Sequence, residues 1–458
     1  MKKFVLLSIM LLISMGMVFA GGTTEKKMID NGSVSLLPGD SSSTDAILQQ
    51  GLPALSNSPV KVDYLTIWTS GKSADAESEW LEKELTSVYP QLTVEIERLG
   101  TNPLKEAATI RVIAGTPPTI ARISGGYAID EFIRQGILQD VTKYWEQYDL
   151  ENLVPPALAN AFKFNGRYYG FPFSDAPQAF LFWNKDAFVN AGVPQPPYDT
   201  WDDFFAAAQL WKTKKPDVPF YTYSLNPGWY GLERAFIQAA TRFGKDFMFR
   251  IFNGEATVQD YTDLLEFNKR LISVSNQDYV SVEGTKGVQE LVIRGDAALC
   301  YSGSWGYAAF VAAGIQDGLN LGYSLLPGYP MQFSTMSGLV VFANSGKESA
   351  GEVIGVHSML KDIQLRLNLL KDNIPARSDV DISAADGWSS LVSYVADQVK
   401  QGAEVIPRAN SGFPSTVLSS MEPVFVSCMT GKTSIADTAR KLVNIQDQNK
   451  EKFSLIRW

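Results

Sequence analysis

The chain has 458 residues, of which 45% are hydrophobic and 19% are charged, so it can form two or three domains with ordinary hydrophobic cores. Its net charge of -9 and its pI of about 5.0 argue against general affinity for nucleic acid or an anionic membrane, because both favour a basic surface. No Gly-x4-Gly-Lys-Ser/Thr nucleotide loop is present, and we expect no cofactor.

The N-terminus has the pattern of an export signal. Lys2 and Lys3 precede an apolar run over residues 4–18, and Ala20 ends a small-residue cleavage motif, which predicts a secretory signal peptide over residues 1–20. The alternative, a transmembrane anchor, is less favoured because the run is near the lower length limit for a span. No cysteine comes directly after the run, so we expect no lipid attachment there. We expect the exported protein to be located in the periplasm. Residues 21–60 are rich in Gly, Ser, Thr, Asn and Asp and predict a flexible leader.

Strands and helices alternate along the first folded part of the chain. The hydrophobic spacing predicts strands over 62–68, 92–96 and 119–123 and helices over 76–89, 104–114 and 127–135. This order indicates βαβ units and a mainly parallel sheet.

Later elements are predicted from turn and capping signals. Asn165 and Gly166 join two short aromatic strands in a hairpin, and an apolar strand follows over residues 179–183. Thr200 is an expected N-cap with Asp203 three residues on. Helices are expected over 201–212, 231–243, 257–273, 286–294, 349–370, 414–429 and 434–450.

Cysteine and histidine are scarce. The two cysteines, Cys300 and Cys428, could pair in an oxidising compartment, but their positions in the sequence do not place them in contact. His357 is the only histidine, and we expect it to be a surface or core residue in a helix. A zinc site of the usual nitrogen and sulfur type is therefore not expected, nor is a catalytic pair that depends on histidine.

The segment 295–306 carries the strongest functional signal. A turn of small residues leads into a short apolar strand, which ends in a Gly-x-Trp turn at Trp305. This pattern places a large aromatic ring at the carboxyl end of a strand, where open α/β sheets bind ligands. A tryptophan in that position can stack on the apolar face of a sugar ring.

Short motifs in a fixed order resemble those of a known family. They are Leu65-Thr66-Ile67-Trp68, Ala114-Gly115-Thr116-Pro117-Pro118, Gln135-Gly136-Ile137-Leu138, Asn165-Gly166-Arg167-Tyr168-Tyr169-Gly170, Trp183-Asn184-Lys185-Asp186, Thr200-Trp201-Asp202-Asp203-Phe204, the segment 295–306 and Leu325-Leu326-Pro327-Gly328. Their joint order and spacing resemble the family 1 extracellular solute-binding proteins of ABC importers, the maltose- and oligosaccharide-binding group. The resemblance runs from Val62 to about Asn449. One departure is Thr119, where the family usually has Asp.

The resemblance implies an α/β, two-lobed periplasmic-binding-protein fold of type II, in which hinge strands join mixed, mainly parallel sheets. The expected N-terminal lobe comprises residues 61–173 plus 333–375, and the expected C-terminal lobe comprises 174–332 plus 376–458. The chain is expected to cross between the lobes near 173–177, 332–337 and 373–377. Ligand would be held in the cleft, which closes by hinge motion.

Candidate ligand contacts in the C-terminal lobe are mostly aromatic. Trp305 corresponds to a stacking tryptophan in similar proteins, and Trp229 to an aromatic ligand position; Tyr230 could exchange roles with Trp229. Asp175 lies at the first expected crossing, where the family often presents an acidic contact. The alternative for the aromatic residues is core packing, and for Asp175 a solvated loop.

Candidate contacts in the N-terminal lobe are polar. The resemblance points to Ser70 and Lys72 in the turn after the first strand, and to Arg122 and Ser124 at the end of the third. Lys72 could instead be a solvated loop residue, and Arg122 could form a structural ion pair. Weaker candidates are Glu79, Ser337 and Phe413.

The resemblance implies a non-enzymatic, monomeric binding protein that captures a carbohydrate and delivers it to an ABC permease. The candidate residues include no cluster of one charge sign, which suits a neutral sugar best. Alternatives are a non-sugar polar solute such as a sugar phosphate or polyamine, a sensory binding protein and, remotely, a secreted glycosidase, which would need a pair of catalytic carboxylates.

Overall fold

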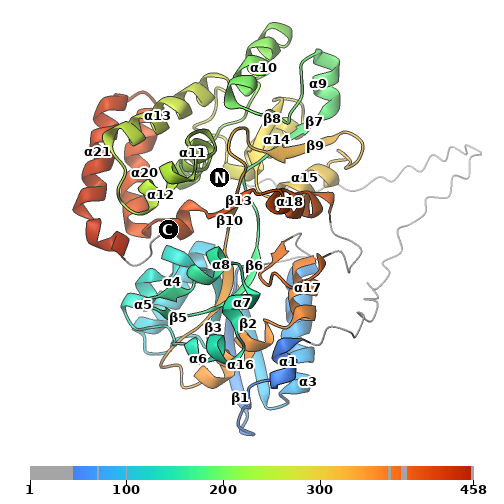
Figure 1. The fold of residues 1–458 in the computed structure, drawn as a ribbon, viewed down its shortest axis with the longest axis vertical. Coiled ribbons are helices and arrows are strands. Elements are labelled where there is room, and N and C mark those ends of the chain that lie inside the picture. Colours follow the sequence, from blue (N-terminus) through green and yellow to red (C-terminus); the bar gives the residue numbers. More distant parts are fainter. Residues whose placement is uncertain (1–44, 70–71, 100, 370–372, 383–388, 455–458) are drawn as a thin grey trace, which may run out of the picture. The chain divides into compact units, whose positions relative to one another are not determined.

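The computed structural model describes residues 45–69, 72–99, 101–369, 373–382 and 389–454 (Figure 1). The predicted signal peptide and the first part of the predicted leader lie outside these residues. Buried hydrophobic side chains between residues 47 and 173 and between 336 and 376 form the core of an N-terminal lobe. Two further clusters, with members between residues 179 and 453, form the core of a C-terminal lobe. The chain therefore has two lobes, as predicted.

A six-stranded sheet forms the centre of the N-terminal lobe, in the order β12-β6-β11-β3-β1-β2. The strands are β1 (Val60–Thr66), β2 (Leu92–Arg98), β3 (Ile120–Ser124), β6 (Phe171–Asp175), β11 (Ser337–Val341) and β12 (Ile374–Pro375). Strand β1 is parallel to β2 and β3, whereas β11 is antiparallel to β3 and β6. The prediction of parallel βαβ units is thus confirmed for the first three strands, and the whole sheet is mixed.

The helices of this lobe follow the predicted order with two corrections. The expected helix 127–135 is a 3-10 turn η2 (Gly126–Ala128) followed by α5 (Asp130–Arg134), and the expected helix 349–370 is divided into α16 (Glu348–His357) and α17 (Lys361–Leu369). The second break is stabilised at Ser358, whose hydroxyl donates to the carbonyl of Gly355 (2.6 Å) and whose carbonyl accepts from Gln364 Nε2 (2.8 Å). Such side-chain bonds compete with the helical backbone pattern.

The remaining elements of the N-terminal lobe surround the sheet. They are α1 (Ala46–Gln50), α2 (Lys72–Glu79), η1 (Trp80–Glu84), α3 (Leu85–Val88), α4 (Thr101–Ile113), α6 (Thr142–Gln147), α7 (Leu150–Leu153), α8 (Pro156–Asn160), β4 (Lys163–Phe164) and β5 (Arg167–Tyr168). Strands β4 and β5 form the predicted hairpin, in which Asn165 and Gly166 both have positive φ.

In the C-terminal lobe, a three-stranded sheet separates the two hydrophobic cores, because successive side chains of a strand point to opposite faces. Strands β7 (Phe180–Asn184), β8 (Leu299–Ser302) and β9 (Leu321–Leu325) form an antiparallel sheet in the order β8-β7-β9. Successive strand residues point to opposite faces. Leu181 and Trp183 of β7 accordingly join the larger cluster, while Phe180 and Phe182 join the smaller one.

Helices and a second small sheet complete the C-terminal lobe. They are α9 (Lys185–Ala191), α10 (Trp201–Lys214), α11 (Gly228–Phe243), α12 (Lys245–Phe252), α13 (Val258–Ser273), α14 (Gly284–Ile293), α15 (Gly306–Ala312), β10 (Met331–Ser334), α18 (Ser390–Lys400), β13 (Glu404–Pro407), α19 (Ala409–Gly412), α20 (Ser415–Met429), α21 (Ile435–Gln448) and η4 (Lys450–Ser454). Strands β10 and β13 pair in parallel. No helix among the described residues is long and apolar enough to span a membrane.

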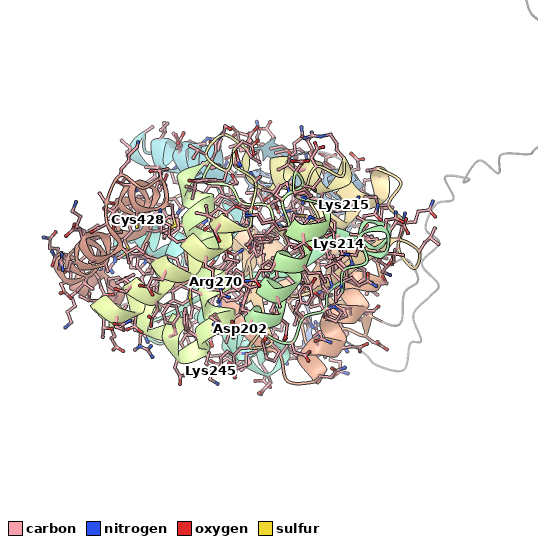
Figure 2. All side chains as sticks on the ribbon, turned by 90° about the horizontal axis from the view of Figure 1, so that it is seen from above. Asp202, Lys214, Lys215, Lys245, Arg270 and Cys428 are labelled. Carbon is pink, nitrogen blue, oxygen red and sulfur yellow. The ribbon has the colours of Figure 1, made fainter. Side chains whose placement is uncertain are left out.

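Two local predictions in this lobe have clear outcomes. The side chains of Thr200 and Asp203 form a reciprocal capping box at the start of α10, as expected. Asp202, which lies between these two residues in the sequence, pairs with Arg270 of α13 at 3.4 Å (Figure 2). Cys428 of α20 and Cys300 of β8 are both buried free thiols, so the disulfide left open by the sequence is not formed.

The ordered chain begins earlier than the sequence predicts. Residues 45–59, expected to belong to the flexible leader, include helix α1 and are attached to the N-terminal lobe. Asp45 forms an ion pair with the buried Arg377 at 3.0 Å, Ile47 is fully buried in the core, and the Gly51 carbonyl accepts from Tyr148 Oη at 3.0 Å. The partners of Asp45 and Gly51 are distant in sequence, so the local composition did not indicate these contacts.

His357 lies at the end of α16 and is a buried core residue, consistent with the sequence-based expectation. Its Nδ1 accepts a hydrogen bond from Trp80 Nε1 at 3.0 Å. Burial lowers the pKa of His357. The folded state therefore favours the neutral ring, and its protonation in acid favours unfolding.

We expect the free energy of unfolding to be highest above the unfolded pKa of histidine, about 6.5, and to fall as the pH drops below it. Urea denaturation at about pH 7.5 and about pH 5.5 checks this on either side of that pKa. His357→Gln should be less stable at the higher pH and should lose most of the difference between the two, since the chain has no other histidine. Equal pH dependence in both proteins would contradict the assignment.

Candidate functional site

A pocket of about 500 Å³ is lined by residues of both lobes. The N-terminal lobe contributes Pro103, Lys105, Ile123, Ser124 and Ala128, and the C-terminal lobe contributes Trp229, Arg408, Asn410, Ser415, Leu418, Ser419 and Glu422. The first set comes from α4, the end of β3 and η2, and the second from the start of α11, from α19 and from α20. The pocket therefore lies where a solute would contact both lobes at once.

The structure brings two of the sequence-based candidates, Trp229 and Ser124, into this pocket. Trp229 lies in the first turn of α11 and remains 37% exposed, which leaves part of its ring available to a ligand. Ser124 ends β3 opposite a third candidate, Ser337, which begins β11. Both serines are buried, and Ser337 Oγ has no hydrogen-bond partner among the described residues.

Two charged residues of the pocket, Lys105 and Glu422, were not among the candidates identified from the sequence. Glu422 of α20 contacts the start of α11: a Cβ on Gly228 would come within 2.5 Å of its Oε1. Burial raises the pKa of Glu422, although a bond from the Trp229 backbone N–H opposes this rise. Arg408 Nε lies 3.7 Å from Glu233 Oε1, and neither atom has a hydrogen-bond partner in the described chain. The sequence predicted a helix over residues 414–429 but did not indicate which of its faces would meet the other lobe.

The lobes touch beside this pocket through backbone atoms. Gly126 has a φ of +69°, and a Cβ there would lie 2.1 Å from the carbonyl oxygen of Ser411. Close by, Ser415 Oγ donates to the Tyr127 carbonyl at 3.2 Å. Only glycine permits both the backbone conformation and the close approach at residue 126.

Trp305 lies at the carboxyl end of β8, as its sequence pattern predicts. It is the N-cap of α15 and is 41% exposed, with its ring packed over Gly303. The Ser304 N–H donates to the Pro177 carbonyl at 2.8 Å, which ties this turn to the segment after β6. Trp305 does not line the 500 Å³ pocket, so the structure does not place it against Trp229.

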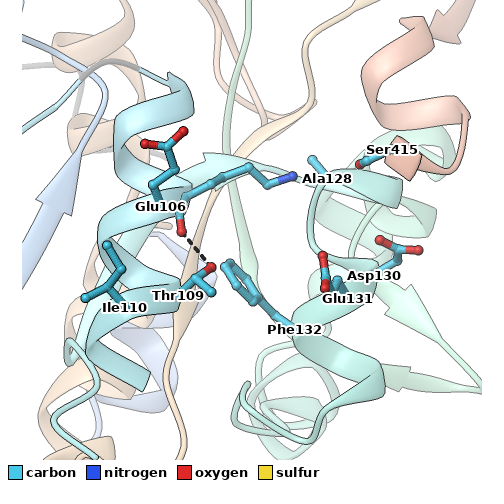
Figure 3. A pocket seen from close by; sticks show the side chains of 9 residues that line it. Glu106, Thr109, Ile110, Ala128, Asp130, Glu131, Phe132 and Ser415 are labelled. Carbon is cyan, nitrogen blue, oxygen red and sulfur yellow. Dashed lines mark hydrogen bonds between the residues drawn. The ribbon is translucent and has the colours of Figure 1, made fainter. Parts of the chain in front are cut away.

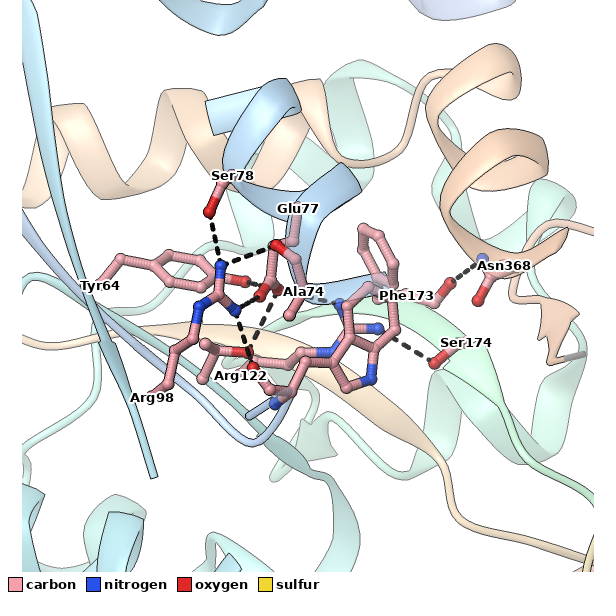
Figure 4. A network of polar contacts seen from close by, with 11 residues as sticks. Tyr64, Ala74, Glu77, Ser78, Arg98, Arg122, Phe173, Ser174 and Asn368 are labelled. Carbon is pink, nitrogen blue, oxygen red and sulfur yellow. Dashed lines mark hydrogen bonds and ion pairs between the residues drawn. The ribbon is translucent and has the colours of Figure 1, made fainter. Parts of the chain in front are cut away.

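Arg122 has a structural role, which corrects its sequence-based assignment. Its side chain is fully buried, and its Nη1 lies 3.2 Å from Glu77 Oε1 (Figure 4). The guanidinium stacks on the rings of Trp68 and Phe173, at 3.4 and 4.0 Å from their centroids, and donates to Ser174 Oγ at 3.2 Å. The structural alternative stated from the sequence therefore holds for this residue.

Glu77 is the centre of this buried network and was not identified from the sequence. It accepts from Tyr64 Oη at 2.8 Å and Thr66 Oγ1 at 3.2 Å, and its Oε2 pairs with Arg98 Nη1 at 3.1 Å. Burial and the adjacent carboxylate raise the pKa of Tyr64 well above its usual range. The network joins α2 to four strands of the sheet, β1, β2, β3 and β6.

The other candidates are dispersed. Phe413 is fully buried and stacks on Phe236 with ring centroids 6.0 Å apart, so we withdraw it as a ligand contact. Tyr230 is buried, with its ring 5.6 Å from the Arg234 guanidinium, and Glu79 forms an exposed pair with Lys83 at 3.6 Å.

Three candidates are described incompletely. Ser70 lies outside the described residues, as do the side chains of Lys72 and Asp175, whose backbones start α2 and end β6. Within the part of the chain that the structure describes, no group of three or more His, Cys, Asp or Glu side chains is arranged to hold a metal ion.

The chain is similar to several known binding proteins. A family model described as "Bacterial extracellular solute-binding protein" matches residues 70–353, more than half of the chain. An uncharacterised ABC transporter extracellular-binding protein of Pyrococcus horikoshii is 23% identical, with 82% of this chain and 85% of that protein covered. A "Probable sugar-binding periplasmic protein" of Brucella suis is also 23% identical, with coverage of 86% and 94%.

Solved structures share the fold at lower identity. A "Chitin oligosaccharide binding protein" is 17% identical with a TM-score of 0.71, covering 86% of this chain and 99% of that chain. The sugar-binding protein MalE from Xanthomonas citri is 18% identical with a TM-score of 0.66, covering 86% and 98%. These similarities confirm the predicted two-lobed fold.

We expect Glu77→Gln to lower the free energy of unfolding by about 3–5 kcal/mol, because it leaves the buried Arg122 without its counter-charge. Glu79→Ala, two residues further along α2, is the control. It should lower the free energy of unfolding by less than about 1 kcal/mol, because the ion pair of Glu79 with Lys83 is exposed. Denaturant titration of both variants measures the difference. Similar costs for the two would refute the structural role of the network.

Proposed function

The chain belongs to the family of bacterial extracellular solute-binding proteins, and we propose that it captures a carbohydrate, either a mono- or an oligosaccharide, between its lobes for an ABC import permease. The observation that supports this proposal most directly is the composition of the pocket between the lobes. It combines the exposed part of Trp229 with hydroxyl, amide and charged groups from both lobes. The names of the similar Brucella and Xanthomonas proteins point to the same ligand class.

Sugar recognition needs the two kinds of surface that this pocket contains. The C–H face of a sugar ring packs on an aromatic face, while its hydroxyls need donors and acceptors, because a buried unpaired polar group costs about 1–3 kcal/mol. Trp229 offers the first kind of surface, and Ser124, Asn410 and Glu422 offer the second. Trp305, exposed at the end of β8, is our proposed second stacking surface.

The charge balance of the pocket supports a neutral ligand. Lys105 and Arg408 are cationic, but Arg408 lies beside Glu233 and the pocket also contains the carboxylate of Glu422. A multiply charged anion would need a cluster of unopposed cations, and a polyamine would need an aromatic cage with carboxylates. Neither arrangement lines this pocket.

We propose that capture works by closure of the two lobes about the segments that connect them. The proposed lobes are residues 61–173 with 333–375 and residues 174–332 with 376–458. Strand β6 pairs with both β11 and β12, so the three expected crossings leave from neighbouring strands. Side-by-side connections of this kind would let the lobes rotate as rigid bodies.

We further propose that the protein acts as a monomer in the periplasm after removal of residues 1–20, and that it returns its ligand chemically unchanged. The permease would recognise the closed form and supply the energy for transport. Recovery of an unaltered saccharide after incubation with the protein distinguishes this from glycosidase activity.

Titration calorimetry against a panel of mono- and oligosaccharides tests the ligand class. We expect saturable binding of at least one sugar, and we expect Trp229→Ala and Trp305→Ala each to weaken it at least tenfold, about 1.4 kcal/mol, through loss of stacking. Tyr329→Ala is the control, because this aromatic ring is 54% exposed but lies outside the pocket.

Absence of binding to every sugar, together with a thermal shift caused by a sugar phosphate, polyamine or peptide, would overturn the carbohydrate proposal. Equal weakening by all three aromatic variants would contradict the proposed stacking positions but leave the ligand class in place.

A further inference from the structure

The backbone has an unusual conformation at two of the connections between the lobes. Among the described residues other than glycine, positive φ angles occur at Asp149, Asn165, Ala179, Met336 and Asn344. Asparagine and aspartate adopt the left-handed region readily, because their short polar side chains can form local hydrogen bonds. Alanine and methionine have no such compensation, so the φ of +81° at Ala179 and of +48° at Met336 are strained.

Both strained residues lie between a strand of one lobe and a strand of the other. Ala179 lies between β6 of the N-terminal lobe and β7 of the C-terminal lobe, and Met336 lies between β10 and β11. Each side chain is fully buried, Ala179 in the larger core of the C-terminal lobe and Met336 in the core of the N-terminal lobe. Each residue is therefore anchored in the lobe that the chain enters, at the end of the connection.

Hydrogen bonds hold both residues in their strained conformations. The carbonyl of Ala179 accepts from the Leu326 N–H at 2.9 Å, within the C-terminal lobe. The carbonyl of Met336 accepts from the Gly125 N–H at 2.9 Å, within the N-terminal lobe. Strained backbone of this kind persists only where the surrounding structure imposes it, and it is concentrated at functional sites and switch regions.

The two connections are also hydrogen-bonded to each other. The Gln178 N–H donates to the Phe333 carbonyl at 2.8 Å, and the Ala176 N–H donates to Thr335 Oγ1 at 3.0 Å. Beyond the connections the strands are paired, β6 with β11 in one lobe and β7 with β8 and β9 in the other. A rotation of the lobes therefore has to be absorbed by the few residues between these strands, which include both strained positions.

The strain is present in an arrangement in which the lobes touch. Ser415 of α20 lies beside Ala128 of η2, and both residues line the pocket between the lobes (Figure 3). Arg134 Nη2 of α5 donates to the carbonyl of Lys452 in η4 at 3.2 Å, which adds a second contact between the lobes. We refer to this as the closed arrangement. Rotation of the lobes apart changes the backbone angles of the connections and so allows the strained residues to leave the left-handed region.

We propose that Ala179 and Met336 are strained hinge residues that disfavour the closed arrangement, so that a bound solute has to hold the lobes together and its loss lets them open. This proposal rests on the lobe closure proposed above and does not depend on the class of solute. Relief of the strain would increase the closed fraction of the protein. The apparent affinity for a solute that binds the closed arrangement would then rise in proportion to that fraction.

The distance between two spin labels, measured by pulsed electron paramagnetic resonance, reports the position of the lobes. Labels are attached to Thr109→Cys and Ser420→Cys, because both residues are exposed and lie on α4 and α20, two helices on opposite sides of the pocket. Cys300 and Cys428 are buried and should remain unlabelled. In the ligand-free mature chain, we expect a short distance from the closed arrangement and a long distance from the open one.

Ala179→Gly removes one methyl group and permits the positive φ. We expect the ratio of short to long distances to rise about fivefold or more. We also expect the melting temperature to be no lower than that of the unaltered protein, because relief of the strain offsets the greater flexibility of glycine in the unfolded chain.

Ala376→Gly is the matched control for this variant. Ala376 is also a fully buried alanine and follows β12 at the third connection, but it is not among the described residues with positive φ. Its replacement relieves no strain. The control should therefore lower the melting temperature and leave the ratio of short to long distances unchanged.

Met336→Asn tests the second strained residue, because asparagine adopts positive φ readily. Met359→Asn is its control, since Met359 is a fully buried methionine of the same core and is not among the described residues with positive φ. Both variants lose core packing, but only Met336→Asn should raise the ratio of short to long distances. An unchanged ratio would contradict the role of Met336.

The outcomes separate the strained hinge from lobe closure itself. A higher ratio in Ala179→Gly that Ala376→Gly does not show supports the strained hinge. An unchanged ratio in Ala179→Gly, or an equal rise in Ala376→Gly, overturns the strained hinge and leaves lobe closure standing. A single distance that neither the variants nor any saccharide of the panel changes overturns both.

Discussion

The carboxylate of Glu77 is the contact on which the pocket-facing edge of the N-terminal lobe depends. From α2 it reaches Arg98 at the end of β2 and Arg122 within β3, and Arg122 in turn reaches Ser174 of β6. These residues lie in four different elements, so a single buried anion fixes the positions at which several strands end. Two guanidinium groups and two hydroxyls satisfy its oxygens, which makes burial of the charge tolerable.

This fixed edge sets the position of the residues that line the pocket. Ser124 follows Arg122 by two residues and faces Ser337 across the β3–β11 pair. The opposite wall comes from α11 and α20, where the Glu422 carboxylate contacts the start of α11 beside Trp229. One wall is thus set by a buried ion network and the other by helix packing. Because each wall is held in place by contacts within its own lobe, the two lobes could move relative to each other without disrupting either wall.

Much of the fold followed from periodicity and local capping. The alternation of strands and helices over residues 60–124, the hairpin at Asn165 and the capping box at Thr200 were all predicted, because each depends on neighbours within a few residues. The predictions of element boundaries were wrong where side chains distant in sequence contact the element. Gln364 donates to the carbonyl of Ser358 just after α16, and Arg377 pairs with Asp45 at the start of a segment that was expected to belong to the leader.

For the candidate site, the sequence by itself determined the family, the order of the elements, the positions of Ser124 and Trp305 at the carboxyl ends of strands, and Trp229 as an aromatic candidate. Only the tertiary structure decided which of the polar candidates face a pocket. Arg122 and Ser124 are two residues apart on one strand, yet one is buried against Glu77 and the other lines the pocket. The physical reason is that burial and ion pairing depend on residues distant in sequence, and local patterns carry no information about those partners.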